Sequence, residues 1–484
     1  MKKILLICKN FLSHQSTGII FLAIAIAVKI LIQIVFFSIL DDKLFQLLAA
    51  KNLLAGHGLT INQILPSDLS TEKFSPLVGW PPGYSIVMAP LLWVFNNDDK
   101  TAALVFDIAC VFPFFFYLVR VVNFLALQKW LKHLFILFAG FFLYPVNSST
   151  STDFISFTCI LAGFYYLLLL MRDNKKPLRL VLLISLFLFL AGFFRYSYIP
   201  VAFCFPILLG IAGLANKKRQ WVNGCYQIGI VLGILIFSLL VFQYYYTGSA
   251  TYINTRETGF FPENLSKMYP VIPASFFDVE FALSFFTKYT AGSYIANGKI
   301  LGYLGYILFA SLLVIGIRWL WKKKKFLKND IDYFTYSGLG ISLAICALLF
   351  YLSLRNSANL LTAYAPWTYI QEFRYFIFIV AFIQLISFAY LFNRFGVLSR
   401  FWKIIAICCT LLFVFQFSLG VYRVSKLIFS RPLFSNLISY HKEIIPVIQW
   451  IGNNEPALKD LSIYYSGEYR NQYFYVPNVT TKQQ

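Results

Sequence analysis

The sequence is poor in charged residues. Only 13% of its 484 residues are Asp, Glu, Lys or Arg, whereas 59% are hydrophobic. Soluble domains carry about 25% charged residues, so a chain of this composition cannot cover itself with a polar surface. The shortage of charge excludes a soluble globular protein and predicts that lipid is the main solvent of the chain.

Acidic residues and metal-binding residues are also scarce. The chain has 20 Asp and Glu against 41 Lys and Arg, with 4 His and 8 Cys, and no Cys-x-x-Cys spacing. The cysteines lie in or beside apolar segments, which favours small buried side chains over zinc or haem attachment. The net charge of +21 does not predict nucleic acid binding, because the basic residues form short clusters between apolar segments.

Apolar segments recur along the chain, each near the roughly 20 residues that cross a bilayer. They predict an all-α polytopic membrane protein with about eleven transmembrane helices. The first apolar segment is too long for a cleaved signal peptide, so we expect it to be a retained span. The predicted spans are residues 18–40, 101–121, 133–148, 153–171, 179–194, 198–215, 224–246, 299–320, 333–354, 373–392 and 403–421.

Basic clusters in alternate connections predict the orientation. The positive-inside rule places these clusters and the basic N-terminus in the cytoplasm. The loops 41–100 and 247–298 then lie on the outer face, which is the periplasmic face of a bacterial inner membrane. We therefore predict a transmembrane catalytic domain over residues 1–421 and a small α/β outer cap over residues 422–484. The basic clusters lie at residues 120–132, 172–179, 217–219, 322–328 and 394–403.

The first outer loop has the most candidates for chemistry. Asp41 and Asp42 follow the first span, and residues 44–54 have the spacing of an amphipathic helix in the membrane interface. Paired carboxylates there suit a general base, because a neighbouring acid and partial burial raise one pKa. A solvated helix N-cap is the alternative interpretation. The loop continues with Gly-His-Gly at residues 56–58 and Trp-Pro-Pro-Gly-Tyr at residues 80–84.

This loop resembles the first outer loop of GT-C glycosyltransferases, most of all the branch with protein O-mannosyltransferases and aminoarabinose transferases. The resemblance lies in the Asp-Asp pair, in residues 49–58 and in the Pro-Pro of residues 80–84. It implies a GT-C-like fold and transfer of one sugar, usually with inversion, from a polyprenyl-phosphate donor to an acceptor on the outer face. Weaker matches lie at residues 151–153, 194–196, 372–375, 450–456 and 464–469.

The resemblance also implies roles for individual residues. Asp41 or Asp42 is the expected base, with Asp41 favoured because the first acid of the family pair is usually catalytic. Asp153 is expected to assist or to orient the acceptor. Candidates for binding the donor phosphate are Arg195, Arg374 and Lys51. For the two arginines, snorkelling beside a local acid is the alternative. Further candidates for substrate binding are His57, Trp80, Tyr84, Glu372 and Tyr375.

The expected partners are the membrane lipid, the polyprenyl-phosphate-linked sugar and an acceptor that is a lipid, a glycan or a protein. No nucleic acid and no resident cofactor is expected. His57 is a candidate ligand for a divalent metal, which some members of the family use. The alternative for His57 is a turn residue between two glycines.

Two other functions remain alternatives. A lipid-linked glycan polymerase or ligase is expected to concentrate Arg and His in a large outer loop, but loop 247–298 contains Arg256 as its only Arg and no His. A transporter or flippase should show internal repeats or ionisable residues within spans. We find no repeat, and Lys29 is the one mid-span charge that stands out.

Overall fold

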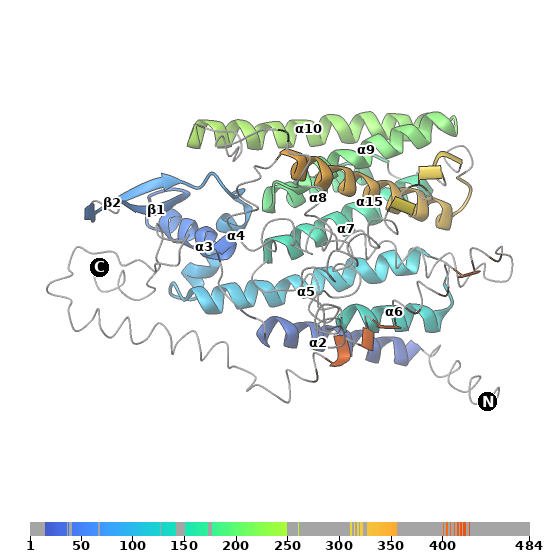
Figure 1. Ribbon diagram of the computed structural model, residues 1–484, viewed down its shortest axis with the longest axis horizontal. Coiled ribbons are helices and arrows are strands. Elements are labelled where there is room, and N and C mark those ends of the chain that lie inside the picture. Colours follow the sequence, from blue (N-terminus) through green and yellow to red (C-terminus); the bar gives the residue numbers. More distant parts are fainter. Residues whose placement is uncertain are drawn as a thin grey trace, which may run out of the picture.

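In the residues that it describes, the computed structural model is mostly helical and contains one β-hairpin (Figure 1). Elements keep the labels of Figure 1 throughout. The structure describes residues 15–35, 37, 41–65, 68–125, 127–141, 151–172, 177–248, 260 and 327–355, together with scattered residues between 310 and 322 and between 400 and 425.

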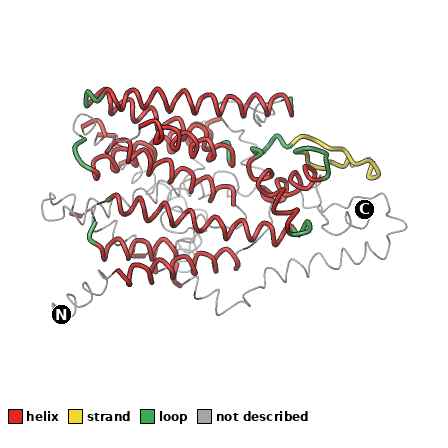
Figure 2. The backbone as a smooth tube through the Cα atoms, turned by 180° about the vertical axis from the view of Figure 1, so that it is seen from behind, coloured by secondary structure: helices red, strands yellow, loops and turns green. Residues whose placement is uncertain are grey.

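The long helices form one bundle. Figures 1 and 2 show them side by side with their axes roughly parallel. Among the described residues, 6 helices (α2, α5 and α7 to α10) are long and apolar enough to cross a membrane, which indicates a multi-pass membrane protein. The helices of the bundle are α2 (Gln15–Val35), α5 (Asp99–Phe124), α6 (Lys129–Phe141), α7 (Ser151–Arg172), α8 (Pro177–Phe194), α9 (Tyr198–Ala215), α10 (Arg219–Thr247) and α15 (Asp330–Arg355).

Most of the predicted spans in the described part of the chain are helices. The six apolar helices match the first, second and fourth to seventh predicted spans, and α15 covers the ninth. Helix α6 begins before the third predicted span and has 13 residues, which is about 20 Å of helix. Residues 142–150 and the span predicted at 373–392 lie outside the described residues, so the total of about eleven spans stays a prediction.

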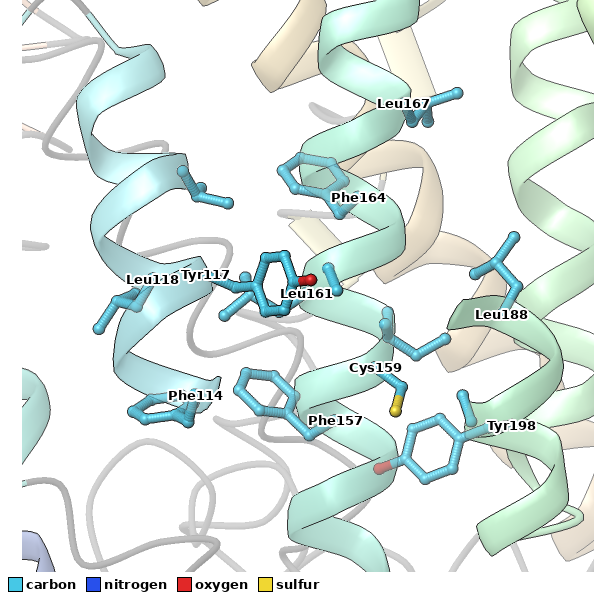
Figure 3. Packing of buried hydrophobic residues seen from close by; sticks show 14 of the residues in the cluster. Phe114, Tyr117, Leu118, Phe157, Cys159, Leu161, Phe164, Leu167, Leu188 and Tyr198 are labelled. Carbon is cyan, nitrogen blue, oxygen red and sulfur yellow. The ribbon is translucent and has the colours of Figure 1, made fainter. Parts of the chain in front are cut away.

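Helix α7 lies inside the bundle and α10 lies at its edge. Of the span in α7, 78% is buried inside the protein, against 22% of the span in α10. Phe114 of α5 packs against Phe157 of α7, with ring centroids 5.9 Å apart (Figure 3). Its ring centroid also lies 5.2 Å from that of Phe154. Close packing of this kind holds helices together in lipid, where burial of apolar surface gives no net driving force.

A small subdomain lies at one end of the bundle, which we call the α3 end (Figure 1). It consists of α3 (Asp41–Leu54), β1 (Thr60–Leu65), β2 (Asp68–Pro76) and α4 (Gly83–Val94). The two strands are antiparallel, with Thr60 opposite Pro76 and a register shift between Ile64 and Leu65. The hairpin was not predicted, because its sequence is polar and lacks the alternation of a half-buried strand.

Helix α3 is helical as predicted, but it does not present a single apolar face. Lys43, Gln46 and Ala49 are buried as completely as Leu47 and Leu48. Helix α4 and strand β1 both pack against α3. Protein therefore surrounds most of this helix, whereas the sequence analysis expected one side of it to rest on lipid.

At the opposite end of the bundle lie described basic residues of three connections that were predicted to be cytoplasmic, those after α5, α7 and α9. Helix α5 ends there, α9 joins α10 there, and the end of α7 lies near the start of α15 (Figure 2). Arg172 at the end of α7 forms an ion pair with Asp330 at 3.5 Å. Lys218 lies over the ring of Trp221, 4.1 Å from its centroid.

Candidate functional site

The Asp41–Asp42 pair forms the first two residues of α3 and follows the connection from α2. Both residues therefore lie in the subdomain at the α3 end. The N-terminus of a helix stabilises negative side chains, because unpaired backbone N–H groups and the helix dipole point there. The side chains of Asp41 and Asp42 themselves lie outside the described part of the structure.

Two lysines of α3 form ion pairs with two aspartates of α5. Lys43 Nζ lies 2.7 Å from Asp107 Oδ2, and both side chains are 1% exposed. Lys51 Nζ lies 3.0 Å from Asp99 Oδ2. The two pairs are about two helical turns apart in each helix and follow in opposite chain order. Helix α3 thus runs antiparallel to the beginning of α5. Its acidic N-terminus is the end that points toward the interior of the bundle.

Lys51 is a candidate for phosphate binding whose charge is already engaged. Its side chain is 13% exposed and that of Asp99 is 4% exposed. Burial lowers the pKa of Lys51, and the nearby Asp99 carboxylate opposes that shift. A donor phosphate at Lys51 would therefore share the ammonium group with Asp99.

Arg195 and Asp153 meet in a buried ion pair. Arg195 follows the last residue of α8, and its Nε lies 2.7 Å from Asp153 Oδ1 in the first turn of α7. Its Nη1 donates a hydrogen bond of 3.4 Å to Thr152 Oγ1. The side chains of Arg195 and Asp153 are 11% and 1% exposed. Two candidates 42 positions apart are thus side by side. The pair matches the alternative interpretation of Arg195, an arginine beside an acidic partner, and donor-phosphate binding by Arg195 stays a prediction.

The turn after Arg195 adds two hydroxyl groups that the sequence analysis did not single out. Tyr196 and Ser197 connect α8 to α9, and the hydroxyl oxygen of each is buried. Neither hydroxyl has a hydrogen-bond partner within the described part of the chain. A buried polar group without a partner costs free energy, so water, a ligand or a residue outside the described part of the chain is expected to supply one.

In the Trp-Pro-Pro-Gly-Tyr segment, Trp80 lies at the surface and Tyr84 packs inside the protein. Trp80 is partly exposed and its ring stacks on Phe45, with centroids 4.9 Å apart. Phe45 lies one turn after Asp41 and on the same side of α3. Tyr84 is fully buried and meets Phe106 edge to face at 5.3 Å. Trp80 can therefore reach a ligand near the acid pair, whereas Tyr84 packs α4 on α5.

Gly83 brings this segment against the residues that precede Arg195. A Cβ atom at Gly83 would collide with the carbonyl oxygen of Phe193, so only glycine permits the approach. Helix α10 contacts the residues just before the Trp-Pro-Pro-Gly-Tyr segment. Gln243 Nε2 donates a hydrogen bond of 3.0 Å to the carbonyl of Leu77. The ends of α8 and α10 thus fix the subdomain on the bundle.

His57 is exposed and stacks on Phe74, with ring centroids 4.1 Å apart. Gly58 beside it has φ +71°, and the ring of Tyr246 leaves no room for a side chain there. In the part of the chain that the structure describes, no three His, Cys, Asp or Glu side chains gather as a metal site requires. His57 is placed by a turn and by aromatic packing.

Three candidates, Glu372, Arg374 and Tyr375, lie outside the described residues. The sequence analysis missed Lys43, Asp99 and Asp107. A signal for Asp107 was present, because it is the only acidic residue between positions 100 and 152 and lies within an apolar run.

Comparison of the chain with protein-family models, with curated proteins and with solved structures found no match.

Proposed function

We propose that the protein is a GT-C-like membrane glycosyltransferase, which transfers a sugar from a polyprenyl-phosphate donor to an acceptor hydroxyl at the α3 end. The observation that carries the proposal is the packing of Gly83 against Phe193, two positions before Arg195. This contact joins the subdomain that begins with Asp41 to the buried Arg195–Asp153 pair. A carboxylate pair and a fixed cation at one end of a membrane bundle match the needs of such a transfer.

In the proposed reaction, Asp41 takes the proton from the acceptor hydroxyl while the acceptor oxygen attacks the anomeric carbon of the sugar. The bond from that carbon to the phosphate oxygen breaks, and its electron pair stays on the phosphate. Asp42 orients Asp41 or the acceptor. Arg195, held by Asp153, stabilises the charge that develops on the leaving phosphate, and Lys51 assists from α3. The product is an inverted glycoside and a polyprenyl phosphate.

We further propose about eleven spans in a bacterial inner membrane, with the N-terminus in the cytoplasm and the α3 end and residues 422–484 in the periplasm. The basic residues at the opposite end of the bundle support this orientation. A cysteine in place of exposed His57 should react with an impermeant thiol reagent in intact spheroplasts. A cysteine in place of exposed Arg219 should react only after permeabilisation, and the reverse pattern would overturn the orientation.

The function can be tested with the full chain in liposomes. Polyprenyl phosphates bearing different radiolabelled sugars would be supplied with extracted membranes as the source of acceptor. We expect one of them to release polyprenyl phosphate and to label an acceptor. The Asp41→Asn protein should bind the donor but transfer about 10²- to 10⁴-fold more slowly. If the wild-type protein releases no polyprenyl phosphate from any donor, the proposal is wrong.

Transport of a lipid-linked substrate is the second candidate, and one observation favours it. Lys29 and Asp107 are buried within the spans of α2 and α5, each with 1% exposure. Ionisable residues inside a membrane often mark a transport pathway. Movement of polyprenyl-phosphate sugars across vesicle bilayers, undiminished in Asp41→Asn and without sugar transfer by the wild-type protein, would favour this function.

A further inference from the structure

Lys43, one partner of the buried Lys43–Asp107 ion pair, directly follows Asp42 in the chain. Lys43 belongs to the first turn of α3, while Asp107 lies about two turns inside the span of α5. The distance between Nζ and Oδ2 is 2.7 Å, and the ammonium group also lies over the ring of Phe37, 4.9 Å from its centroid. The first turn of α3 is therefore attached to the interior of the bundle.

Burial of this pair is costly, so its presence calls for an explanation. Two charges that leave water lose hydration, and their attraction often does no more than offset that loss. A well-packed apolar pair would hold two helices together equally well. A charged pair differs in that it fixes how the two helices are oriented at the contact, because the ammonium and the carboxylate must meet with defined geometry.

The other parts of α3 are held by separate contacts. Ser85 Oγ of α4 donates a hydrogen bond of 2.8 Å to the carbonyl of Gln46, in the second turn. The Lys51–Asp99 pair holds the last turn. Loss of the Lys43–Asp107 pair is therefore expected to release the first turn alone and to leave the remainder of α3 in place.

We infer that the Lys43–Asp107 pair positions the Asp41–Asp42 carboxylates for the transfer step and takes no part in donor binding. The role of the acid pair rests on the proposed function. Neither Lys43 nor Asp107 needs to touch the substrate, because both side chains are enclosed by protein. They act through the backbone of the first turn, and a base displaced by about 1 Å can cost about 100-fold in rate.

The test replaces both partners, giving Lys43→Met together with Asp107→Leu. This double variant removes both charges of the pair together, so it should fold even if the single variants do not. We expect kcat to fall about 100-fold while KM for the donor stays within about threefold. The control, Arg172→Met with Asp330→Leu, removes an exposed pair at the opposite end and should leave both constants unchanged.

Hydrogen exchange gives a second readout that does not depend on activity. In an α-helix, the amides of Phe45 and Gln46 bond to the carbonyls of Asp41 and Asp42. These two amides should exchange about tenfold faster in the Lys43→Met, Asp107→Leu protein, and the amides of the last turn of α3 should not change.

The outcomes separate the two proposals. Unchanged exchange at Phe45 and Gln46, or an unchanged kcat, would overturn the positioning role. So would a rise in donor KM that accounts for the whole loss of activity. A wild-type protein without transferase activity would overturn the proposed function, and the exchange rates would still decide whether the pair orders the first turn of α3.

Discussion

Lysine, arginine and aspartate serve two different purposes at the two ends of the bundle. At the α3 end, the Lys43–Asp107, Lys51–Asp99 and Arg195–Asp153 pairs are 2.7 to 3.0 Å long, and none of their side chains is more than 13% exposed. At the opposite end, the Arg172–Asp330 pair is 3.5 Å long, with side chains 44% and 31% exposed. The buried pairs join helices inside the protein, whereas the exposed pair is screened by solvent.

Cation–π contacts occur at both ends of the bundle. At the opposite end, Arg120 lies 4.3 Å from the ring centroid of Phe116 and Arg172 lies 4.6 Å from that of Phe124. Arg172 makes this contact in addition to its ion pair with Asp330, so cation–π contact and ion pairing occur together there. At the α3 end, Trp80 and Phe45 stack on each other, and Lys43 lies over the ring of Phe37 as well as beside Asp107.

The largest effect on activity is expected from the acid pair. Asp41→Asn keeps the shape of the side chain but removes its ability to take a proton, so the transfer rate should fall about 10²- to 10⁴-fold. Asp42→Asn should cost less, because Asp42 orients and does not accept the proton. Transfer rates and donor binding would be measured on both purified proteins. Turnover within a few-fold of wild type in both would remove the acid pair from the chemistry.

The next largest effect is expected when a buried ion pair loses one partner. Arg195→Ala leaves Asp153 buried without its cation and should lower the free energy of unfolding by about 3–5 kcal/mol. Addition of Asp153→Asn should restore part of that loss. Thermal unfolding in detergent would measure it, with exposed Arg179→Ala of α8 as the control. A stability equal to that of the control would show that the Arg195–Asp153 pair is not formed.

A smaller effect is expected where the subdomain meets the end of α8. Gly83→Ala places a methyl group against the carbonyl oxygen of Phe193, and the forced shift should cost about 1–3 kcal/mol. Gly79→Ala is the matched control, because a Cβ atom there meets nothing within 4 Å. Thermal unfolding of the two proteins would separate them. Equal unfolding temperatures would contradict the close contact between α4 and α8.

The smallest effect is expected at the opposite end. Arg172→Ala removes one partner of the exposed pair with Asp330, and solvent screens the charge that remains. The free energy of unfolding should fall by less than about 1 kcal/mol. This variant is the direct counterpart of Arg195→Ala. A loss in Arg172→Ala as large as that in Arg195→Ala would remove the contrast between the two ends.

The bundle was predictable because membrane helices follow from local composition. An apolar run of sufficient length must satisfy its backbone hydrogen bonds internally, so α2, α5 and α7 to α10 could be placed without any knowledge of their neighbours. The start of α3 at the acid pair was predictable for a similar reason, since helical spacing begins there. The hairpin of β1 and β2 was not, because its polar residues pair through backbone hydrogen bonds that show no alternating apolar pattern.

The sequence by itself determined that this chain is a membrane protein. It also singled out Asp41, Asp42, Asp153 and Arg195 as candidate site residues. Only the tertiary structure decided which charges meet. The partners of the three buried pairs are 42, 48 and 64 positions apart in the chain. No local pattern links residues at such separations, because their pairing depends on the packing of helices whose apolar surfaces would tolerate several arrangements. A buried charge tolerates only the arrangement that supplies its partner.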